Sequence, residues 1–559
     1  MKKILLTILP YWSPVVPPVG LAALKSFLQP RGYKVRAVDL ISKIESLKFY
    51  YDYFDVLKKY IPEEKRGNFY NIGHDLLPRH MMAHLNHEDE KEYIELVKLL
   101  IYTNYYVAVD NQCILELNGL VQGFYELLRR YFLYLLKYEK PDVVGITLYK
   151  TTLPASLFVL KLTKETYPHI KTVVGGGIFA DSHAVGTPNF ETLLEVSKDY
   201  LDHLFIGEGE LLFLKYLRGE LPASQRVYTI DDLKSETLAP GDIDIPDFSD
   251  FNVYRYGYLA ATASYSCKYR CSFCNVHRFT GKFRKRDVSR TVNEMIRLSE
   301  KYKRQRFFMT DMIINPVITD LANEVIKQKV LLYYDAYYRV DDASTDIKNT
   351  SSWRQGGLYR VRLGVESGSQ RILDKMRKGI TVDQIKAALT SFAYSGIKTT
   401  TYWIIGHPGE TEEDFQQTLD LVEELKDSIW QAECNPFRYF FNGQNCSSEW
   451  DRHRVGLYPE KAVDMLVFQD WTLDLQPSRQ VTYERVHRFV EHCKKLGIPN
   501  PYLVNEACEA DERWHQLHKN AAPSVMDFMG VGNYVDEMKN VKPVLAAVDT
   551  KGDDIDFNF

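Results

Sequence analysis

Residues 264–279 read SYSCKYRCSFCNVHRF and place Cys267, Cys271 and Cys274 within one short stretch. The other five of the eight cysteines lie singly along the chain. The apolar residues 258–266 come first and predict a strand, so the three thiols lie on a loop at its carboxyl end. Cysteines this closely spaced indicate a metal centre.

Two kinds of metal centre fit the spacing of these cysteines. A four-iron four-sulfur cube that is bound by three cysteines leaves one iron free for an outside ligand. Zinc is the alternative, because His277 could complete a tetrahedron as the fourth ligand. Zinc sites commonly pair Cys-x2-Cys with a second, more distant pair, so the spacing favours the cube.

Strands and helices alternate after the cysteines. We expect helices over residues 283–302 and 315–328, and strands over 306–311, 331–340, 359–367 and 398–406. A parallel, partial barrel of the TIM type would gather the ends of all these strands around the cysteines.

A second alternating pattern precedes the cysteines. We expect strands over residues 3–9, 33–40, 142–149, 171–177 and 203–210, and helices over 19–32 and 153–167. Such alternation implies a doubly wound parallel sheet, whose ligand lies beyond the carboxyl ends of the strands. Gly175–Gly177 and Gly207–Gly209 follow two of these strands and would let a flat ligand approach the backbone, although tight turns explain them equally well.

The remaining segments suggest the domain boundaries. Residues 46–138 interrupt the first pattern with aromatic-rich helical segments, which could lie over a cofactor or help to form a substrate cavity. The Pro- and Asp-rich residues 231–256 form a linker. Residues 431–559 carry helical patterns over 478–497 and 505–520, so we expect a small, mainly helical domain that selects the substrate.

Composition excludes several classes of protein. The chain has 559 residues, 45% of them hydrophobic, and a net charge of −4, which gives no general reason to expect nucleic-acid binding. It has no apolar stretch long enough to span a membrane, and its eight cysteines are too sparse for a secreted disulfide scaffold. We therefore expect a cytoplasmic protein of two or three domains.

The motif CKYRCSFC resembles the Cys-x3-Cys-x-aromatic-Cys signature of radical SAM enzymes. Residues 364–381, GVESGSQRILDKMRKGIT, and 404–415, IIGHPGETEEDF, are similar to the fourth and fifth strand regions of that superfamily. The resemblance implies a partial (β/α)6 barrel over 257–430, a 4Fe-4S cluster on the three cysteines and S-adenosyl-L-methionine on the free iron.

The same resemblance assigns residues to the S-adenosylmethionine site. It implies contacts from Phe273, Asp311, Arg339, Glu366 and Ser367. Three of these five residues could instead have a role in holding the fold together. Asp311 could cap the helix after Asn315, Arg339 could pair with Asp341 or Asp342, and Glu366 could form a structural salt bridge.

Residues 17–40, 141–147, 173–177 and 206–210 resemble, in this order, the cobalamin-binding domain at the front of cobalamin-dependent radical SAM enzymes. A Rossmann-like cobalamin domain is therefore expected over 1–230. Such domains usually carry a cobalt-ligating histidine after the first strand, whereas the loop LPYWSPVVPP has none. Trp12 could cover the lower face of cobalamin instead, or be a core aromatic residue. The resemblance implies cobalamin contacts from Tyr11, Trp12, Gly20, Thr147, Tyr149, Gly175, Gly176, Gly177, Gly207, Glu208 and Gly209.

The combined expectation is an enzyme that methylates an unactivated carbon centre, with phosphorus as second choice, in a natural product or peptide. One S-adenosylmethionine would methylate cobalamin and a second would give a 5′-deoxyadenosyl radical. Flavodoxin or ferredoxin would supply the electron. A radical rearrangement, ring contraction or cyclisation with the same cofactors is the alternative. A non-enzymatic cobalamin sensor or a binding protein structured by zinc is a third reading.

Overall fold

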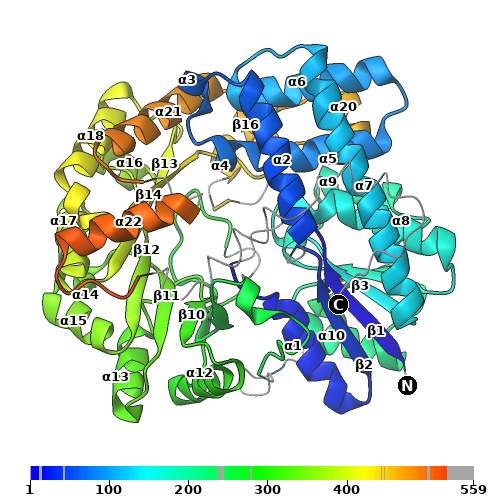
Figure 1. Ribbon diagram of the computed structural model, residues 1–559, viewed down its shortest axis with the longest axis horizontal. Coiled ribbons are helices and arrows are strands. Elements are labelled where there is room, and N and C mark those ends of the chain that lie inside the picture. The colour runs from blue at the N-terminus through cyan, green and yellow to red at the C-terminus, as the bar shows by residue number, and fades with distance from the viewer. Residues whose placement is uncertain are drawn as a thin grey trace.

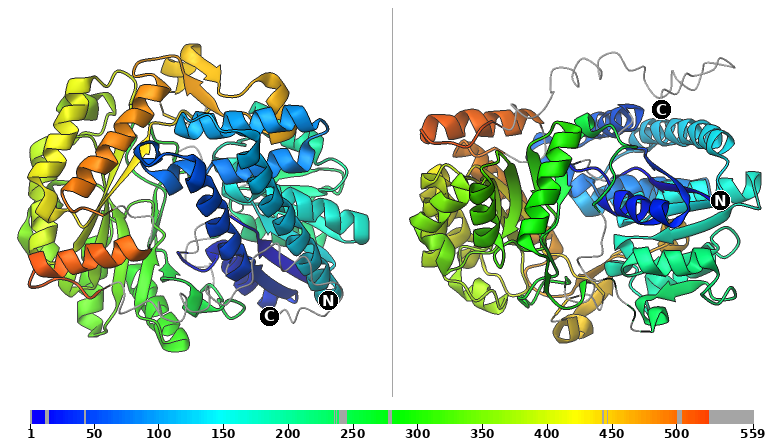
Figure 2. Two further views of the ribbon diagram at one scale, coloured as in Figure 1. Left: turned by 45° about the horizontal axis from the view of Figure 1, so that its top comes forward. Right: turned by 90° about the horizontal axis from the view of Figure 1, so that it is seen from below.

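The computed structural model describes residues 2–524 apart from 12–14, 42–43, 235, 237, 239–244, 277–279, 442–443, 446 and 500–503. Trp12 and His277, both named in the sequence predictions, lie outside the described residues. Two parallel sheets organise the described chain, and they lie side by side (Figures 1 and 2). The predicted fold class of two α/β modules is confirmed.

The first sheet has the strand order β2-β1-β3-β4-β5-β6, and all its pairs are parallel. Its strands are β1 (Lys3–Ile8), β2 (Lys34–Asp39), β3 (Val143–Thr147), β4 (Lys171–Gly175), β5 (His203–Ile206) and β6 (Val227–Thr229). The helices between them are α1 (Val19–Leu28), α8 (Leu153–Thr166), α9 (Pro188–Val196) and α10 (Gly209–Arg218). The strand order reverses between β1 and β3, and ligands bind at such a reversal.

A helical insertion separates β2 from β3 and occupies residues 44–139. Its helices are α2 (Ile44–Tyr60), α3 (Glu63–Arg66), α4 (Phe69–Gly73), α5 (Leu76–Asn86), α6 (Glu90–Tyr105) and α7 (Asn111–Glu139). Aromatic side chains hold it together, as in the stacked pair Phe49 and Phe124, whose centroids are 4.6 Å apart. Its first helices lie beyond the carboxyl ends of the strands of the first sheet, and α7 runs back along the sheet to the start of β3 (Figure 1).

The second sheet has the order β14-β13-β12-β11-β10-β7 and is also parallel throughout. Its strands are β7 (Leu259–Ala261), β10 (Arg306–Met309), β11 (Tyr333–Tyr338), β12 (Leu358–Glu366), β13 (Lys398–Ile405) and β14 (Gln431–Pro436). The main covering helices are α12 (Val288–Tyr302), α13 (Ile318–Gln328), α15 (Ile347–Gln355), α17 (Val382–Tyr394) and α18 (Glu412–Glu424). The sheet does not close on itself, which confirms the predicted partial barrel.

Two boundaries in this region differ from those expected from the sequence. The expected strand over 258–266 breaks after Ala261, and its end forms β8 (Ser264–Tyr265), which pairs antiparallel with β9 (Arg284–Lys285). The sixth barrel strand, β14, lies wholly beyond residue 430, the expected end of the barrel, and Cys434 lies within this strand with its side chain buried.

The C-terminal region combines helices with one hairpin. It contains α19 (Ser447–Trp450), α20 (Glu460–Leu466), α21 (Arg479–Lys495), α22 (Val504–Leu517) and the antiparallel pair β15 (Arg454–Gly456) and β16 (Trp471–Leu473). On α22, Asp511 accepts a hydrogen bond of 3.0 Å from Trp430 Nε1 and lies 2.9 Å from Lys398 Nζ. Because Lys398 begins β13, α22 covers the amino-terminal end of the barrel, opposite the cysteines (Figure 2). No helix in the described part of the chain has the length and apolarity to cross a membrane.

Candidate active site

The cysteine loop, residues 266–276, follows β8 at the carboxyl end of the barrel. Cys271 is buried, Cys267 and Cys274 are half-buried, and all three thiols are free. Ser272 N donates to the carbonyl of Met376 at 2.8 Å, and Asn445 Nδ2 donates to the carbonyl of Cys271 at 2.9 Å. These hydrogen bonds fix the backbone of the loop.

Burial favours the protonated form of two of the three thiols. It raises the pKa of Cys274 to about 11 and also raises the pKa of Cys267. In the described part of the chain, no three His, Cys, Asp or Glu side chains are grouped to hold a single metal ion. A four-iron cube does not need such grouping, because each thiolate binds a different iron.

Two cations lie against the aromatic residues of the cysteine loop. The Arg339 guanidinium is 3.9 Å from the ring centroid of Tyr269, and Lys378 Nζ is 5.7 Å from that of Phe273. Both positive charges oppose the burial that raises the pKa of Cys267. They would also balance the negative charge that three thiolates bring to an iron–sulfur cluster, so the site fits such a cluster.

Sequence reasoning missed Lys378, which is buried and lies 2.6 Å from Glu366 Oε1. Glu366 ends β12 with a left-handed backbone φ of 71°, which turns the chain toward Lys378. The salt bridge that was the alternative reading for Glu366 is therefore present. A contact of Glu366 with S-adenosylmethionine stays a prediction.

Arg339 differs from Lys378 because no described carboxylate pairs with its charge. It forms no ion pair within the described residues, and its Nε is buried without a hydrogen-bond partner. Asp341, its expected structural partner, instead accepts hydrogen bonds from Asn315 and Tyr338. An unpaired guanidinium beside the cysteines suits an anionic ligand such as a carboxylate.

Two residues predicted to contact S-adenosylmethionine have buried side chains, and these contacts stay predictions. Asp311 is fully buried and accepts hydrogen bonds from Ala263 N at 3.0 Å and Ser264 Oγ at 2.5 Å. It therefore ties the end of β10 to the segment before the cysteines, and it does not cap a helix. Ser367 is also buried, and its hydroxyl accepts from Ser369 N at 3.1 Å. Both side chains accept hydrogen bonds from other residues of the protein.

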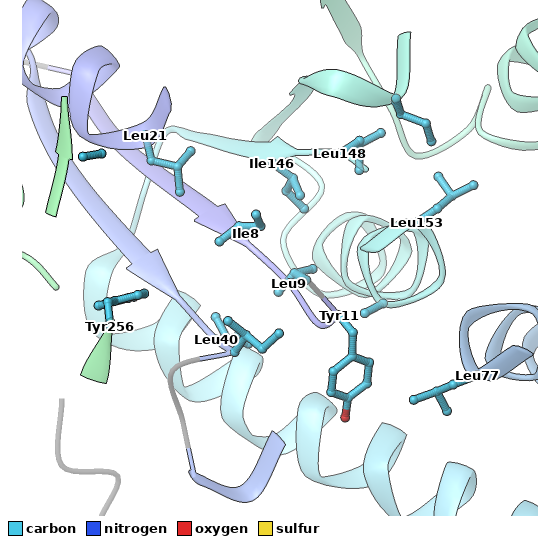
Figure 3. Packing of buried hydrophobic residues seen from close by; sticks show 14 of the residues in the cluster. Ile8, Leu9, Tyr11, Leu21, Leu40, Leu77, Ile146, Leu148, Leu153 and Tyr256 are labelled. Carbon is cyan, nitrogen blue, oxygen red and sulfur yellow. The ribbon is translucent and has the colours of Figure 1, made fainter. Parts of the chain in front are cut away.

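Tyr11 is buried at the end of β1. Its side chain is only 3% exposed, its hydroxyl donates to the carbonyl of Ser46 at 3.0 Å, and its ring lies 5.7 Å from that of Phe124. Figure 3 shows Tyr11 beyond the end of β1 within the buried hydrophobic cluster. The insertion supplies this apolar environment, so Tyr11 is part of the core, and its contact with cobalamin stays a prediction.

The glycine loops are shaped by close approaches within the protein. Gly176 has a φ of 114°, and a Cβ there would lie 2.7 Å from the carbonyl of Leu148. Gly207 has a φ of 111°, and a Cβ would lie 2.4 Å from Ile230. The tight-turn reading therefore explains both positions, and a role in ligand approach stays a prediction.

Two other residues predicted to contact cobalamin are exposed, so the carboxyl edge of the first sheet is open beside them. Tyr149 is 43% exposed although it follows a central strand, and Gly20, at the start of α1, is exposed, with no atom within 4 Å of the place that a Cβ would take. Such an edge fits a large, flat ligand. The remaining predicted contacts lie along the same edge: Thr147 ends β3, Gly175 ends β4, Gly177 lies against the Tyr149 ring, and Glu208 and Gly209 lead into α10.

The carboxyl edges of the two sheets meet. Arg284, on the hairpin of the cysteine loop, pairs with Glu208, which follows β5 of the first sheet. A cavity of about 350 Å³ also has walls from both modules, with Tyr149 and Asp181 from the first and Gly406 and Phe437 from the second. The cavity therefore lies between the two modules, and of the predicted contact residues its described lining includes Tyr149.

Sequence reasoning missed the charged residues of this cavity. Asp470 pairs with Arg79 and lies 2.5 Å from Lys150 Nζ, and Asp75 lies 2.7 Å from Arg438. These residues come from the insertion, the first sheet, the end of the barrel and the C-terminal region. No local motif could have linked them.

Residues 262–422 match the family model described as the radical SAM superfamily. This part of the chain is a radical SAM domain. It contains the cysteine loop and the four barrel strands from β10 to β13.

Curated relatives align with about half of the chain. The anaerobic magnesium-protoporphyrin IX monomethyl ester cyclase of Rubrivivax gelatinosus is 27% identical over 310 residues, which cover 51% of this chain and 54% of the cyclase. The cytidylyl-2-hydroxyethylphosphonate methyltransferase of Streptomyces wedmorensis is 26% identical over 347 residues, covering 51% of this chain and 62% of that protein. The chain thus spans less than two thirds of each of these relatives.

Solved structures resemble the chain beyond its radical SAM domain. The radical S-adenosylmethionine methyltransferase TsrM from Kitasatospora setae, with cobalamin and a [4Fe-4S] cluster bound, has a TM-score of 0.57 at 14% identity and covers 96% of this chain and 99% of its own. The cobalamin-dependent S-adenosylmethionine radical enzyme OxsB has a TM-score of 0.50 at 16% identity, covering 89% of this chain and 56% of its own. The radical SAM domain therefore lies within a fold that these two proteins share.

Proposed function

We propose that the protein is a cobalamin-dependent radical SAM methyltransferase that acts on an unactivated carbon of a small molecule or peptide. One observation carries the proposal: the cysteine-bearing edge of the barrel meets the open edge of the first sheet, through the pair Arg284 and Glu208. Methyl transfer by radical chemistry needs two cofactors and the substrate held close together, and this arrangement provides that proximity.

The barrel residues have distinct roles in this proposal. Cys267, Cys271 and Cys274 would bind a [4Fe-4S] cluster, and the unpaired guanidinium of Arg339 would bind the carboxylate of S-adenosylmethionine. The buried pair of Lys378 and Glu366 would fix the side of the S-adenosylmethionine site that lies next to Phe273. When bound, the cofactors supply a 5′-deoxyadenosyl radical and a methyl group. The protein orients them and excludes water.

The first sheet would bind cobalamin at its carboxyl edge. Exposed Gly20 and Tyr149 border the place where the strand order reverses. Cobalamin is named in the structures of TsrM and OxsB, which share the fold. We expect no histidine beneath the cobalt, because the loop over residues 9–18 contains none.

The proposal can be tested without knowing the substrate. The reconstituted protein is incubated under reducing conditions with cobalamin and S-adenosylmethionine that carries a CD3 group. Mass spectrometry of the corrin should then detect the label on cobalamin. Cobalamin that is bound and reduced but never labelled would contradict methyl transfer.

Cyclisation is the second candidate, because curated relatives include ring-forming enzymes such as the cyclase of Rubrivivax gelatinosus. In that case cobalamin would handle an electron and S-adenosylmethionine would be cleaved without donating its methyl group. Formation of 5′-deoxyadenosine together with unlabelled cobalamin would favour this second candidate over methyl transfer.

A further inference from the structure

The cavity of about 350 Å³ between the modules has no assigned ligand. Its volume suits a small organic molecule. Its described lining residues include none of the three cluster cysteines and neither Arg339 nor Lys378. The cavity is therefore not part of the predicted sites for the cluster and S-adenosylmethionine, and Tyr149, a predicted cobalamin contact, is among its lining residues.

One wall of the cavity is aromatic. Phe437, Phe441 and Trp471 all line it, and the rings of Phe441 and Trp471 have centroids 5.2 Å apart. Trp471 Nε1 is buried without a hydrogen-bond partner. Buried indole N–H groups usually have such a partner, so this wall offers both ring contacts and one available donor.

The charged residues of the cavity leave an excess of positive charge. Four cationic side chains, Arg79, Lys150, Arg438 and Arg479, face three carboxylates, Asp75, Asp181 and Asp470. Asp75 and Asp470 pair with the first three of these cations. Burial raises the pKa of Asp181 above its ordinary value.

Arg479 is the cation whose charge is not balanced. It begins α21, where Nη2 donates to Tyr483 Oη at 2.7 Å and Nη1 donates to Tyr106 Oη at 3.2 Å and to the carbonyl of Thr103. All these acceptors are neutral, and no carboxylate in the described part of the chain pairs with Arg479. Its guanidinium is thus held in place with its charge available to a ligand.

We propose that this cavity binds the substrate, and that the substrate is a flat aromatic molecule carrying a carboxylate or phosphate. The anionic group would lie on Arg479 and the ring against Trp471. The inference rests on the proposed function, because it takes the cavity between the two cofactor sites to be the place of the reaction. It adds the substrate class, which the fold does not indicate.

The nucleotide tail of cobalamin combines an aromatic ring with a phosphate and could satisfy the same chemistry. The experiment must therefore distinguish binding of a substrate from binding of the nucleotide tail of cobalamin. Titration calorimetry would follow the binding of indole-3-acetate to the reconstituted protein, first without cobalamin and then with cobalamin bound. Tryptamine, which lacks the anion, and hexanoate, which lacks the ring, are the matched probes.

We expect indole-3-acetate to bind saturably in both states, with tryptamine and hexanoate binding at least tenfold more weakly. Arg479→Gln and Trp471→Leu should each weaken binding by about tenfold, the loss expected for one charge-assisted or ring contact. Arg479→Lys should bind within a few-fold of wild type. Arg488→Gln is the control, because Arg488 lies on the same helix, pairs with Glu412 and does not line the cavity.

Four results would overturn the inference. Three of these are no saturable binding of indole-3-acetate, equal binding of tryptamine, and unchanged binding in Arg479→Gln. Loss of the probe when cobalamin binds would assign the site to the cofactor and would also overturn it. Failure of the proposed function is separate, because that failure would show as bound, reduced cobalamin that is never labelled by the CD3 group while probe binding persisted.

Discussion

At the scale of single residues, the three cysteines carry the proposed radical chemistry. Replacing Cys267, Cys271 or Cys274 with alanine removes one of three thiolate ligands, and we predict that each variant loses 5′-deoxyadenosine formation completely. The measurement is chromatography of the reaction with S-adenosylmethionine and dithionite. Cys508→Ala is the control, because Cys508 lies on α22, at the opposite end of the barrel. Normal cleavage by any one of the three variants would refute the cluster assignment.

The unpaired charge of Arg339 leads to a prediction about redox potential. Removing a half-buried cation near the cluster makes reduction harder, so Arg339→Gln should lower the midpoint potential by on the order of 50 mV. Spectroelectrochemical titration without S-adenosylmethionine measures this potential. Arg270→Gln removes the same charge from an exposed position between two of the cysteines, and solvent should screen its effect. Equal shifts in both variants would argue against a specific role for Arg339.

Residue predictions from the sequence succeeded where the signal was local. The three cysteines lie within one motif, and the structure places them together on one loop. Lys378 and Arg479 could not be found in this way, because their importance comes from Phe273, Tyr106 and other residues far away in the sequence. Tyr11 was assigned to the ligand edge because the sequence does not show that the insertion would bury it.

At the scale of elements, Asp311 links the end of β10 to the segment that leads into the cysteine loop. Burial raises its pKa from 3.8 to about 6. The protonated carboxyl therefore stabilises the fold fully below pH 4, and this contribution is lost as the pH rises through 6.

Asp311→Asn keeps the shape of the side chain and removes its titration. We predict that the variant equals wild type in stability near pH 4 and exceeds it at pH 8, by on the order of 3 kcal/mol. Thermal unfolding of the two proteins across this pH range measures the difference, with the exposed Asp464→Asn as a charge control. A constant difference at every pH would show that Asp311 does not titrate in this range.

Most elements could be predicted because their periodicity is strong. The barrel strands and α21 lie close to their expected positions. The strand over 258–266 was predicted too long, because nothing in its apolar pattern indicates that Ser264 and Tyr265 leave the sheet to pair with β9. The three-residue strand β6 is too short to give a pattern.

At the scale of the whole molecule, the order of the two modules could be read from the sequence, whereas their relative placement could not. The contact of Arg284 with Glu208 and the cavity between the modules depend on residues that are far apart in the chain. The fold shared with TsrM extends over both modules. The central claim follows from this arrangement: one protein holds a radical-generating cluster beside cobalamin.

Electron paramagnetic resonance of the anaerobically reconstituted, reduced protein with cobalamin tests this claim most directly. Our account predicts a cluster signal that changes when S-adenosylmethionine is added. It also predicts a cob(II)alamin signal without threefold nitrogen splitting, because the loop over residues 9–18 has no histidine and we expect the cofactor's own base to be displaced. Zinc in place of iron with no cluster signal, or cobalt lines still split into three by nitrogen, would contradict the account.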